Sequence, residues 1–143
     1  MTRKVGGFLL VRAGGRMVGL PLVQVLEVIS IGEIHPVPVV EPAMRGLVAV
    51  HGRTMPLVHL GALLERLPCP PTGGGQGVVI AVDGRRVCLE IEEAEILIRE
   101  APLPVPPGET LPWAIGVARH AGGLVPLLDL PAISSRLMEA AET

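Results

Sequence analysis

The sequence predicts a mainly β protein made of two small five-stranded barrel halves packed side by side, with short helices. Three observations predict this architecture. The segment 46–67, GLVAVHGRTMPLVHLGALLERL, recurs at 116–137 as GVARHAGGLVPLLDLPAISSRL. A self-match at a fixed offset indicates that one supersecondary unit is used twice. Short aliphatic runs between turn residues are typical of β-strands. Short antiparallel strands avoid exposed edges most readily by curling into barrels.

Glycine and proline residues stand at corresponding positions in the two copies. Identical residues stand at these corresponding places: Gly46 and Gly116, Gly52 and Gly122, Pro56 and Pro126, Leu60 and Leu130, Leu67 and Leu137. The upstream parts correspond as well, with Gly15-Arg16 over Gly84-Arg85, after a slip of one residue in the register. The internal duplication therefore covers most of the chain.

The first half, about residues 8–67, begins with apolar runs at 8–12 and 17–22 that flank a glycine hairpin. Polar residues at every third position of 23–30 indicate one helical turn that leads into a strand. Three prolines in the stretch 35–42 exclude a helix interior and a central strand, so this stretch is expected to be an extended surface connection.

The repeated unit follows. It is expected to contain a strand from Gly46, a turn at His51-Gly52, a second strand at 55–58 and then a helix. Leucines at positions 60, 63, 64 and 67 have the i, i+3, i+4, i+7 spacing of one helical face.

Residues 68–76 are rich in proline and glycine, and they are predicted to be the linker between the halves. The second half, about residues 77–137, begins with strands at 77–82 and 87–91 around an Asp83-Gly84 hairpin. Pro131 fits the first turn of a C-terminal helix, expected at 131–141.

Length and composition restrict the class of protein. The 143 residues suit one domain with a sizeable core. No apolar run is long enough to span a bilayer, and the N-terminus lacks the apolar core of a secretory signal. Two cysteines form no disulfide framework, so a reducing compartment and a cytoplasmic location are expected. A net charge of −2 and 1% aromatic residues argue against nucleic-acid binding.

No catalytic, cofactor or metal site is expected from the motifs. The four histidines lack the spacing that makes a zinc site convincing. The glycine clusters lack the residues of a phosphate-binding loop, and no serine or cysteine lies in a nucleophile elbow. Glu90, Glu92, Glu93 and Glu95 are interpreted as a solvated charged face.

Several segments together resemble the CheW-like domain family of bacterial chemosensory signalling. They are Val25–Ile29, His35-Pro36-Val37-Pro38, the strand pair 46–60, Leu89–Leu97 and the final strand pair 116–130. The resemblance spans nearly the whole chain and treats 1–143 as a single CheW-like domain. It implies SH3-like barrels and a non-catalytic adaptor that couples a CheA-type histidine kinase, through its regulatory domain, to chemoreceptor cytoplasmic tips. It implies no membrane insertion.

The resemblance also implies where partners dock. The matching positions are Val25, Glu27, Val28, His51 and Gly52, with Gly116 in the second half. Two positions depart from the family pattern, because His51 replaces a usual arginine and His59 replaces a usual acidic residue. Two alternatives stay open: a divergent CheW-like paralogue in another pathway, and a stand-alone ligand- or metal-binding barrel.

Overall fold

The computed structural model of the chain describes residues 7–38, 41–71, 73, 75–108 and 113–142, without the side chains of 136 and 138–142. Its elements are β1 (Phe8–Ala13), β2 (Arg16–Pro21), β3 (Val25–Ser30), β4 (Met44–Val50), β5 (Arg53–His59), α1 (Leu60–Glu65), β6 (Gln76–Val82), β7 (Arg85–Ile91), β8 (Glu93–Ile98), β9 (Ala114–His120), β10 (Gly123–Leu128) and α2 (Leu130–Glu142). The prediction of a mainly β fold with short helices is confirmed.

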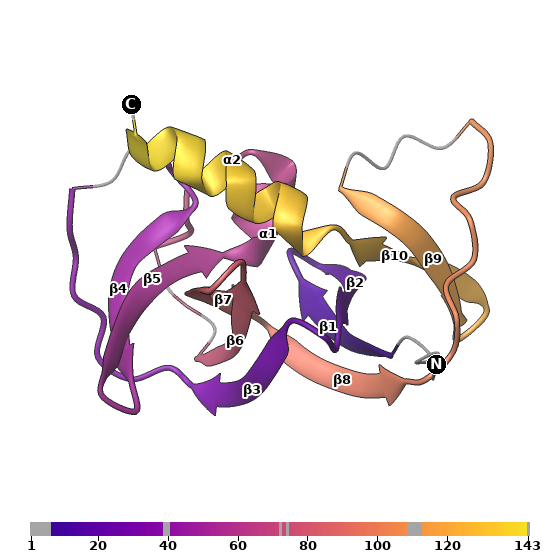
Figure 1. Cartoon of the computed structure of the whole chain (residues 1–143), viewed down its shortest axis with the longest axis horizontal. Coiled ribbons are helices and arrows are strands. Elements are labelled where there is room, and N and C mark those ends of the chain that lie inside the picture. Colours follow the sequence, from indigo (N-terminus) through magenta and orange to yellow (C-terminus); the bar gives the residue numbers. More distant parts are fainter. Residues whose placement is uncertain (1–6, 39–40, 72, 74, 109–112, 143) are drawn as a thin grey trace.

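The strands form two five-stranded sheets that lie side by side (Figure 1). One sheet has the order β8-β1-β2-β10-β9, and the other has the order β3-β6-β7-β5-β4. Helices α1 and α2 lie together along one side of the molecule, at the junction of the two sheets (Figure 1). The expected pair of five-stranded units is therefore present.

The two sheets do not coincide with the two sequence halves. Strand β3 belongs to the first half but pairs with β6 of the second half, and β8 of the second half pairs with β1 of the first. The sheet β3-β6-β7-β5-β4 is thus continuous in sequence, whereas the other sheet joins both ends of the chain. Residues 8–67 and 77–137 were each expected to form one barrel. In the structure, each sheet instead contains strands of both halves.

A short turn connects β2 in one sheet to β3 in the other. The amide of Gln24 donates to the carbonyl oxygen of Pro21, and the amide of Val25 donates to that of Leu22, each at 3.1 Å. These bonds form one turn that leads into β3, as the spacing of polar residues predicts. At the corresponding place in the second half, Glu92 alone separates β7 from β8.

Two-residue turns close four of the hairpins. The central pairs Gly14-Gly15, His51-Gly52, Asp83-Gly84 and Ala121-Gly122 all have positive φ at both positions. Such turns twist in the same sense as the strands that they join, and glycine at the second position carries little conformational cost. Turn residues therefore set the strand registers that begin at these hairpins.

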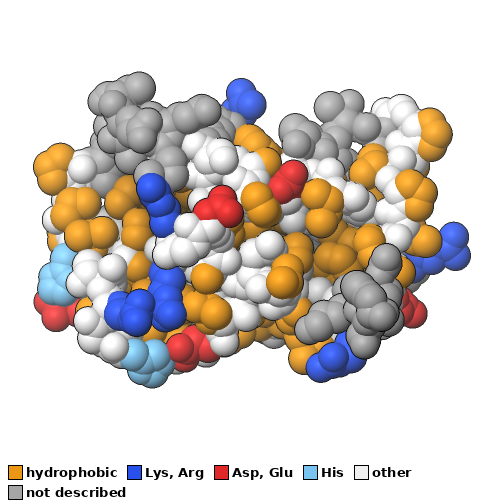
Figure 2. Space-filling view, viewed as in Figure 1, with side chains coloured by type: hydrophobic (Ala, Val, Ile, Leu, Met, Phe, Trp, Pro, Cys, Tyr) orange, Lys and Arg blue, Asp and Glu red, His pale blue; other side chains and the backbone are white. Residues whose placement is uncertain are grey.

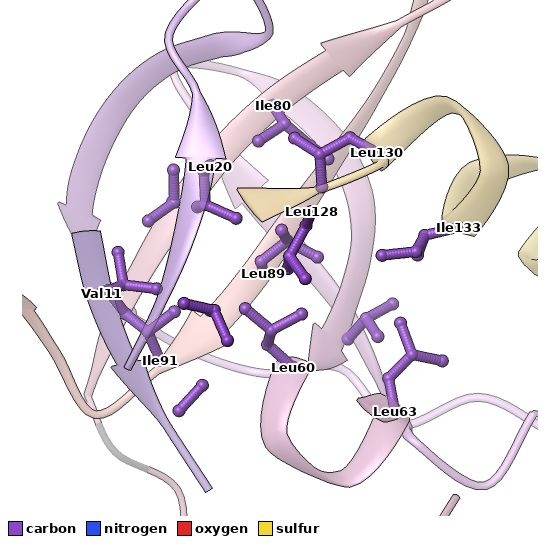
Figure 3. Close-up of a cluster of buried hydrophobic side chains, with 14 of the residues drawn as sticks. Val11, Leu20, Leu60, Leu63, Ile80, Leu89, Ile91, Leu128, Leu130 and Ile133 are labelled. Atoms are coloured by element: carbon purple, nitrogen blue, oxygen red, sulfur yellow. The ribbon is translucent and has the colours of Figure 1, made fainter. Parts of the chain in front are cut away.

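The largest hydrophobic cluster is shared by both sheets and both helices (Figure 3). It includes Val11 and Leu20 of one sheet, Ile80 and Leu89 of the other, and Leu60 of α1. All five side chains are buried. This shared core holds the sheets together, and it contains the repeated pair Leu60 and Leu130. Leu67 lies beyond the end of α1 and is 52% exposed, so the expected leucine face is shorter than the spacing indicated.

Cys69 and Cys88 are free thiols in the structure. Cys88 is fully buried in a smaller core next to β5, as expected for a small core residue in a strand. Neither of the two helices, in the residues that the structure describes, is long and apolar enough to cross a bilayer.

Candidate functional site

Glu27 and His51 meet on the surface of the sheet that contains β3. Nε2 of His51 lies 3.0 Å from a carboxylate oxygen of Glu27. The two side chains remain 41% and 74% exposed for Glu27 and His51, respectively, so a partner can reach both. The resemblance to the family indicated Glu27 and His51 as separate positions, and the structure brings their side chains into contact.

Local backbone geometry positions this pair. β3 alternates half-buried and exposed residues, and Glu27 lies on the half-buried side between Val25 and Ile29. The pairing of β3 with β6 shifts register between Val25 and Glu27, which indicates a bulge at this point. His51 occupies the first central position of the β4–β5 turn with φ of 51°. The turn therefore presents the imidazole at the end of the hairpin.

A shallow hollow of about 320 Å³ lies beside the pair, between β3 and the end of β4. Its lining consists of Glu27, Ile29, Ser30, Gly32, Val48, Ala49, Val50 and His51. Both β3 and β4 are edge strands of their sheet. The hollow thus has both a polar pair and aliphatic side chains in its lining, a mixture that is common at protein-docking surfaces.

Exposed aliphatic side chains surround this end of the sheet. Val28 and Leu26 lie on the outer face of β3 and are 43% and 46% exposed, and Val23 in the preceding turn is 84% exposed. Figure 2 shows hydrophobic side chains exposed on one face of the molecule, with acidic and basic groups scattered between them. Exposed apolar side chains that lie next to one another are typical of surfaces that bind partners.

The other expected docking residues have different positions. Gly52 adjoins His51 in the same turn, with open space around its Cα. Val25 is half-buried and packs against the main core, so it supports β3 from below. Gly116 is buried on β9 in the other sheet, where a Cβ would lie 2.8 Å from the carbonyl oxygen of Leu103. Gly116 thus permits close packing of the chain and lies apart from the Glu27–His51 pair.

A second polar cluster, which the sequence did not indicate, joins β4 to β7. Glu90 is 1% exposed and accepts hydrogen bonds from Arg45 through both carboxylate oxygens. The interpretation of Glu90 as part of a solvated face is therefore wrong, because β7 turns this side chain inward. Arg45 also donates to the carbonyl oxygen of Pro70 at 2.7 Å.

A cavity of about 480 Å³ adjoins this cluster, with His59, Glu65 and Glu92 among its lining residues. Burial lowers the pKa of His59 below its ordinary 6.5, against the opposing effect of Glu90. Burial also raises the pKa of the Cys69 thiol. Among the residues that the structure describes, no three His, Cys, Asp or Glu side chains are grouped to hold a metal ion.

One comparison with known proteins identifies the family, and a second shows a similar fold. A family model described as the CheW-like domain matches residues 7–138. The chain belongs to the CheW-like domain family. The fold is also similar to that of the scaffolding protein TtCheW from Thermoanaerobacter tengcongensis. That crystal structure aligns with a TM-score of 0.75 and 16% identity, over 90% of this chain and 91% of that one. No curated protein sequence matches the chain significantly.

CheW family proteins are non-catalytic scaffold proteins, and membership of this family supports a scaffold or adaptor role in chemotaxis signalling for the chain.

Proposed function

We propose that the chain couples a CheA-type histidine kinase to chemoreceptors in the cytoplasm. The kinase would dock through its regulatory domain, and the receptor would dock through its cytoplasmic tip. The observation that carries the proposal is the Glu27–His51 contact at 3.0 Å, exposed at the rim of an aliphatic hollow. We place the kinase-facing surface there, with Gly52 in the same turn as His51. Val28 lies on the other face of β3 and would extend this surface around the edge strand.

The residue types suit a specific but reversible contact. Apolar side chains at the centre of a docking surface supply most of the affinity when they are buried by a partner. A polar pair at the rim contributes mainly to specificity and register. The pair also links β3 to the β4–β5 turn at the rim of the hollow.

A binding titration tests the proposal. The purified chain is titrated by calorimetry against the regulatory domain of a CheA-type kinase from the same genome, and separately against a receptor cytoplasmic fragment. Saturable one-to-one binding of the kinase domain is expected, at a Kd of about micromolar or tighter. Glu27→Arg is expected to abolish this binding and to leave the circular dichroism spectrum and the urea midpoint unchanged.

Glu100→Arg is the matched control, because Glu100 is an exposed glutamate outside the strands and distant in sequence from β3. It makes the same change of charge and is expected to bind as the unmodified chain does. Equal loss of binding in both variants would indicate a general effect of charge. Glu27 would then have no specific role in the docking surface. A folded chain that binds no kinase domain would refute coupling of this kind and favour a CheW-like role in another pathway.

A further inference from the structure

The two helices of the repeat begin with the same hydrogen bond but with different side chains. Before α1, Nδ1 of His59 accepts the amide hydrogen of Ala62 at 3.0 Å. Before α2, Oδ1 of Asp129 accepts the amide hydrogen of Ala132 at 3.1 Å. A carboxylate accepts over the whole physiological pH range, whereas an imidazole accepts only while it is neutral. The duplicated cap thus has one carboxylate copy and one imidazole copy, and protonation of the imidazole would break the second.

The geometry fixes the tautomer of His59. Because Nδ1 accepts a hydrogen bond, the proton of the neutral ring must be on Nε2. Protonation would make both nitrogens donors, and the amide of Ala62 would face another N–H group. The first turn of α1 would then lose the side-chain acceptor for one of its unpaired amides.

Charged groups face His59 from each element around it. Glu90 on β7 and Glu92 after β7 favour the charged ring, whereas Arg45 on β4 opposes it. Glu65 of α1 lines the same cavity as His59. The half-buried thiol of Cys69 donates to the carbonyl oxygen of Ala43 and stays neutral. Burial has the largest effect, so the pKa of His59 is lowered and the ring is neutral at pH 7.

Helix α1 joins the two sheets. It follows β5 in one sheet, and its Gly61 packs on the β1–β2 turn of the other. A Cβ built on Gly61 would lie 2.6 Å from the backbone nitrogen of Gly14, so the two backbones are in direct contact. Leu60, Ala62 and Leu63 of the same helix are buried in the shared core. Loosening the first turn of α1 would therefore loosen the contact between the sheets.

We propose that His59 is a pH-sensitive cap whose protonation releases the first turn of α1 from the β1–β2 hairpin. Above the ordinary pKa of 6.5 the cap is complete in the folded chain. Below it, the unfolded chain binds the proton more readily than the folded chain does, so stability falls until the pH passes the lower folded value. The device does not depend on the docking partner.

Amide hydrogen exchange of the full-length chain tests this proposal. Protection of the Ala62 amide, corrected for intrinsic exchange, is measured by NMR at about pH 7.5 and about pH 5. A fall of roughly five-fold, the usual effect of a lost cap, is expected as the pH falls through the folded pKa of His59. Protection of the Ala132 amide at α2 is the internal comparison and is expected to stay constant, because the side chain that caps α2 has no imidazole ring.

Two variants use the repeat as its own control. His59→Asn keeps a capping oxygen that does not titrate, so protection of Ala62 should become independent of pH. Asp129→His should make protection of Ala132 depend on pH. An equal acid loss in the unmodified chain and in His59→Asn would overturn the proposal. A second readout needs no variant: the midpoint of the Ala62 change must equal the midpoint of the His59 ring ¹⁵N titration, and different midpoints would also overturn it.

Discussion

Arg45 and Glu90 form a buried ion pair that spans a strand. Nε of Arg45 on β4 lies 2.6 Å from Oε1 of Glu90 on β7, and β5 separates these two strands in the sheet. The side chains are only 12% and 2% exposed, respectively. Arg45 also bonds to Pro70, and a Cβ on Gly73 would touch Glu90, so the linker between the sequence halves packs over the pair.

Removing one member of this pair is predicted to destabilise the fold strongly. Glu90→Gln leaves the Arg45 guanidinium buried without its counter-charge, which typically costs about 3–5 kcal/mol. Urea denaturation followed by circular dichroism measures the loss, with Glu100→Gln as the exposed control. The double variant Arg45→Met with Glu90→Leu should be more stable than Glu90→Gln alone. If the double variant lost as much stability as Arg45→Met and Glu90→Leu lose when their separate effects are added, the charge argument would be contradicted.

Gly61→Ala is predicted to weaken the contact between α1 and the β1–β2 hairpin. The added methyl group would meet the backbone of Gly14, which cannot move aside as a flexible side chain does. Overpacking of this kind typically costs about 1–3 kcal/mol. Thermal and urea unfolding measure the effect. Gly32→Ala is the control, because nothing lies within 4 Å of a Cβ built there. If Gly61→Ala and Gly32→Ala were equally stable, α1 would be able to shift away from the β1–β2 hairpin without a loss in the free energy of unfolding.

The Cys88 thiol is predicted to be unreactive until the chain unfolds. Burial, with a smaller contribution from Glu90, raises its pKa to about 12. Stability from this group is complete below pH 9.0 and is lost as the pH rises from 9.0 towards 12, since the unfolded thiol ionises first. In a Cys69→Ser chain, reaction of Cys88 with a disulfide reagent should follow the rate of unfolding. A rate equal to that of a free thiol would contradict this burial.

The Glu27–His51 contact is predicted to matter for binding more than for stability. Both side chains are exposed, so the pair should contribute no more than about 1 kcal/mol to folding. A double-mutant cycle with Glu27→Gln and His51→Ala measures this coupling by urea denaturation and, separately, by binding to the kinase domain. His51→Arg keeps a donor beside Glu27 and should bind at least as tightly as the unmodified chain. A folding coupling well above that limit would make the pair a structural one.

Local pattern was sufficient for most of the secondary structure. Turn pairs such as His51-Gly52 and Asp83-Gly84 carry their own conformational preference, and the leucine spacing after His59 predicts α1 without reference to any partner. The repeat made the prediction stronger, because the same unit had to fold twice. Residues at the docking surface were named only by resemblance to the family, and whether they bind partners stays a prediction.

Long-range pairing could not be predicted in this way. The alternation of β3 indicates which side chains face inward, but it does not indicate that β6 rather than β2 lies beside it. Glu90 stands among other glutamates in the sequence. Its burial is possible only because Arg45, far away in the chain, supplies the opposite charge beside it. The contact between Glu27 and His51 likewise depends on the distance between β3 and the β4–β5 turn.

The sequence by itself determined the class of fold, the duplication, the turns and the family, since each depends on neighbouring residues or on order along the chain. The tertiary structure alone decided which strands share a sheet, which charges are buried and which residues of the candidate surface meet. Those features depend on contacts between distant segments, whose free energy is gained only when the shared core of both sheets closes around them.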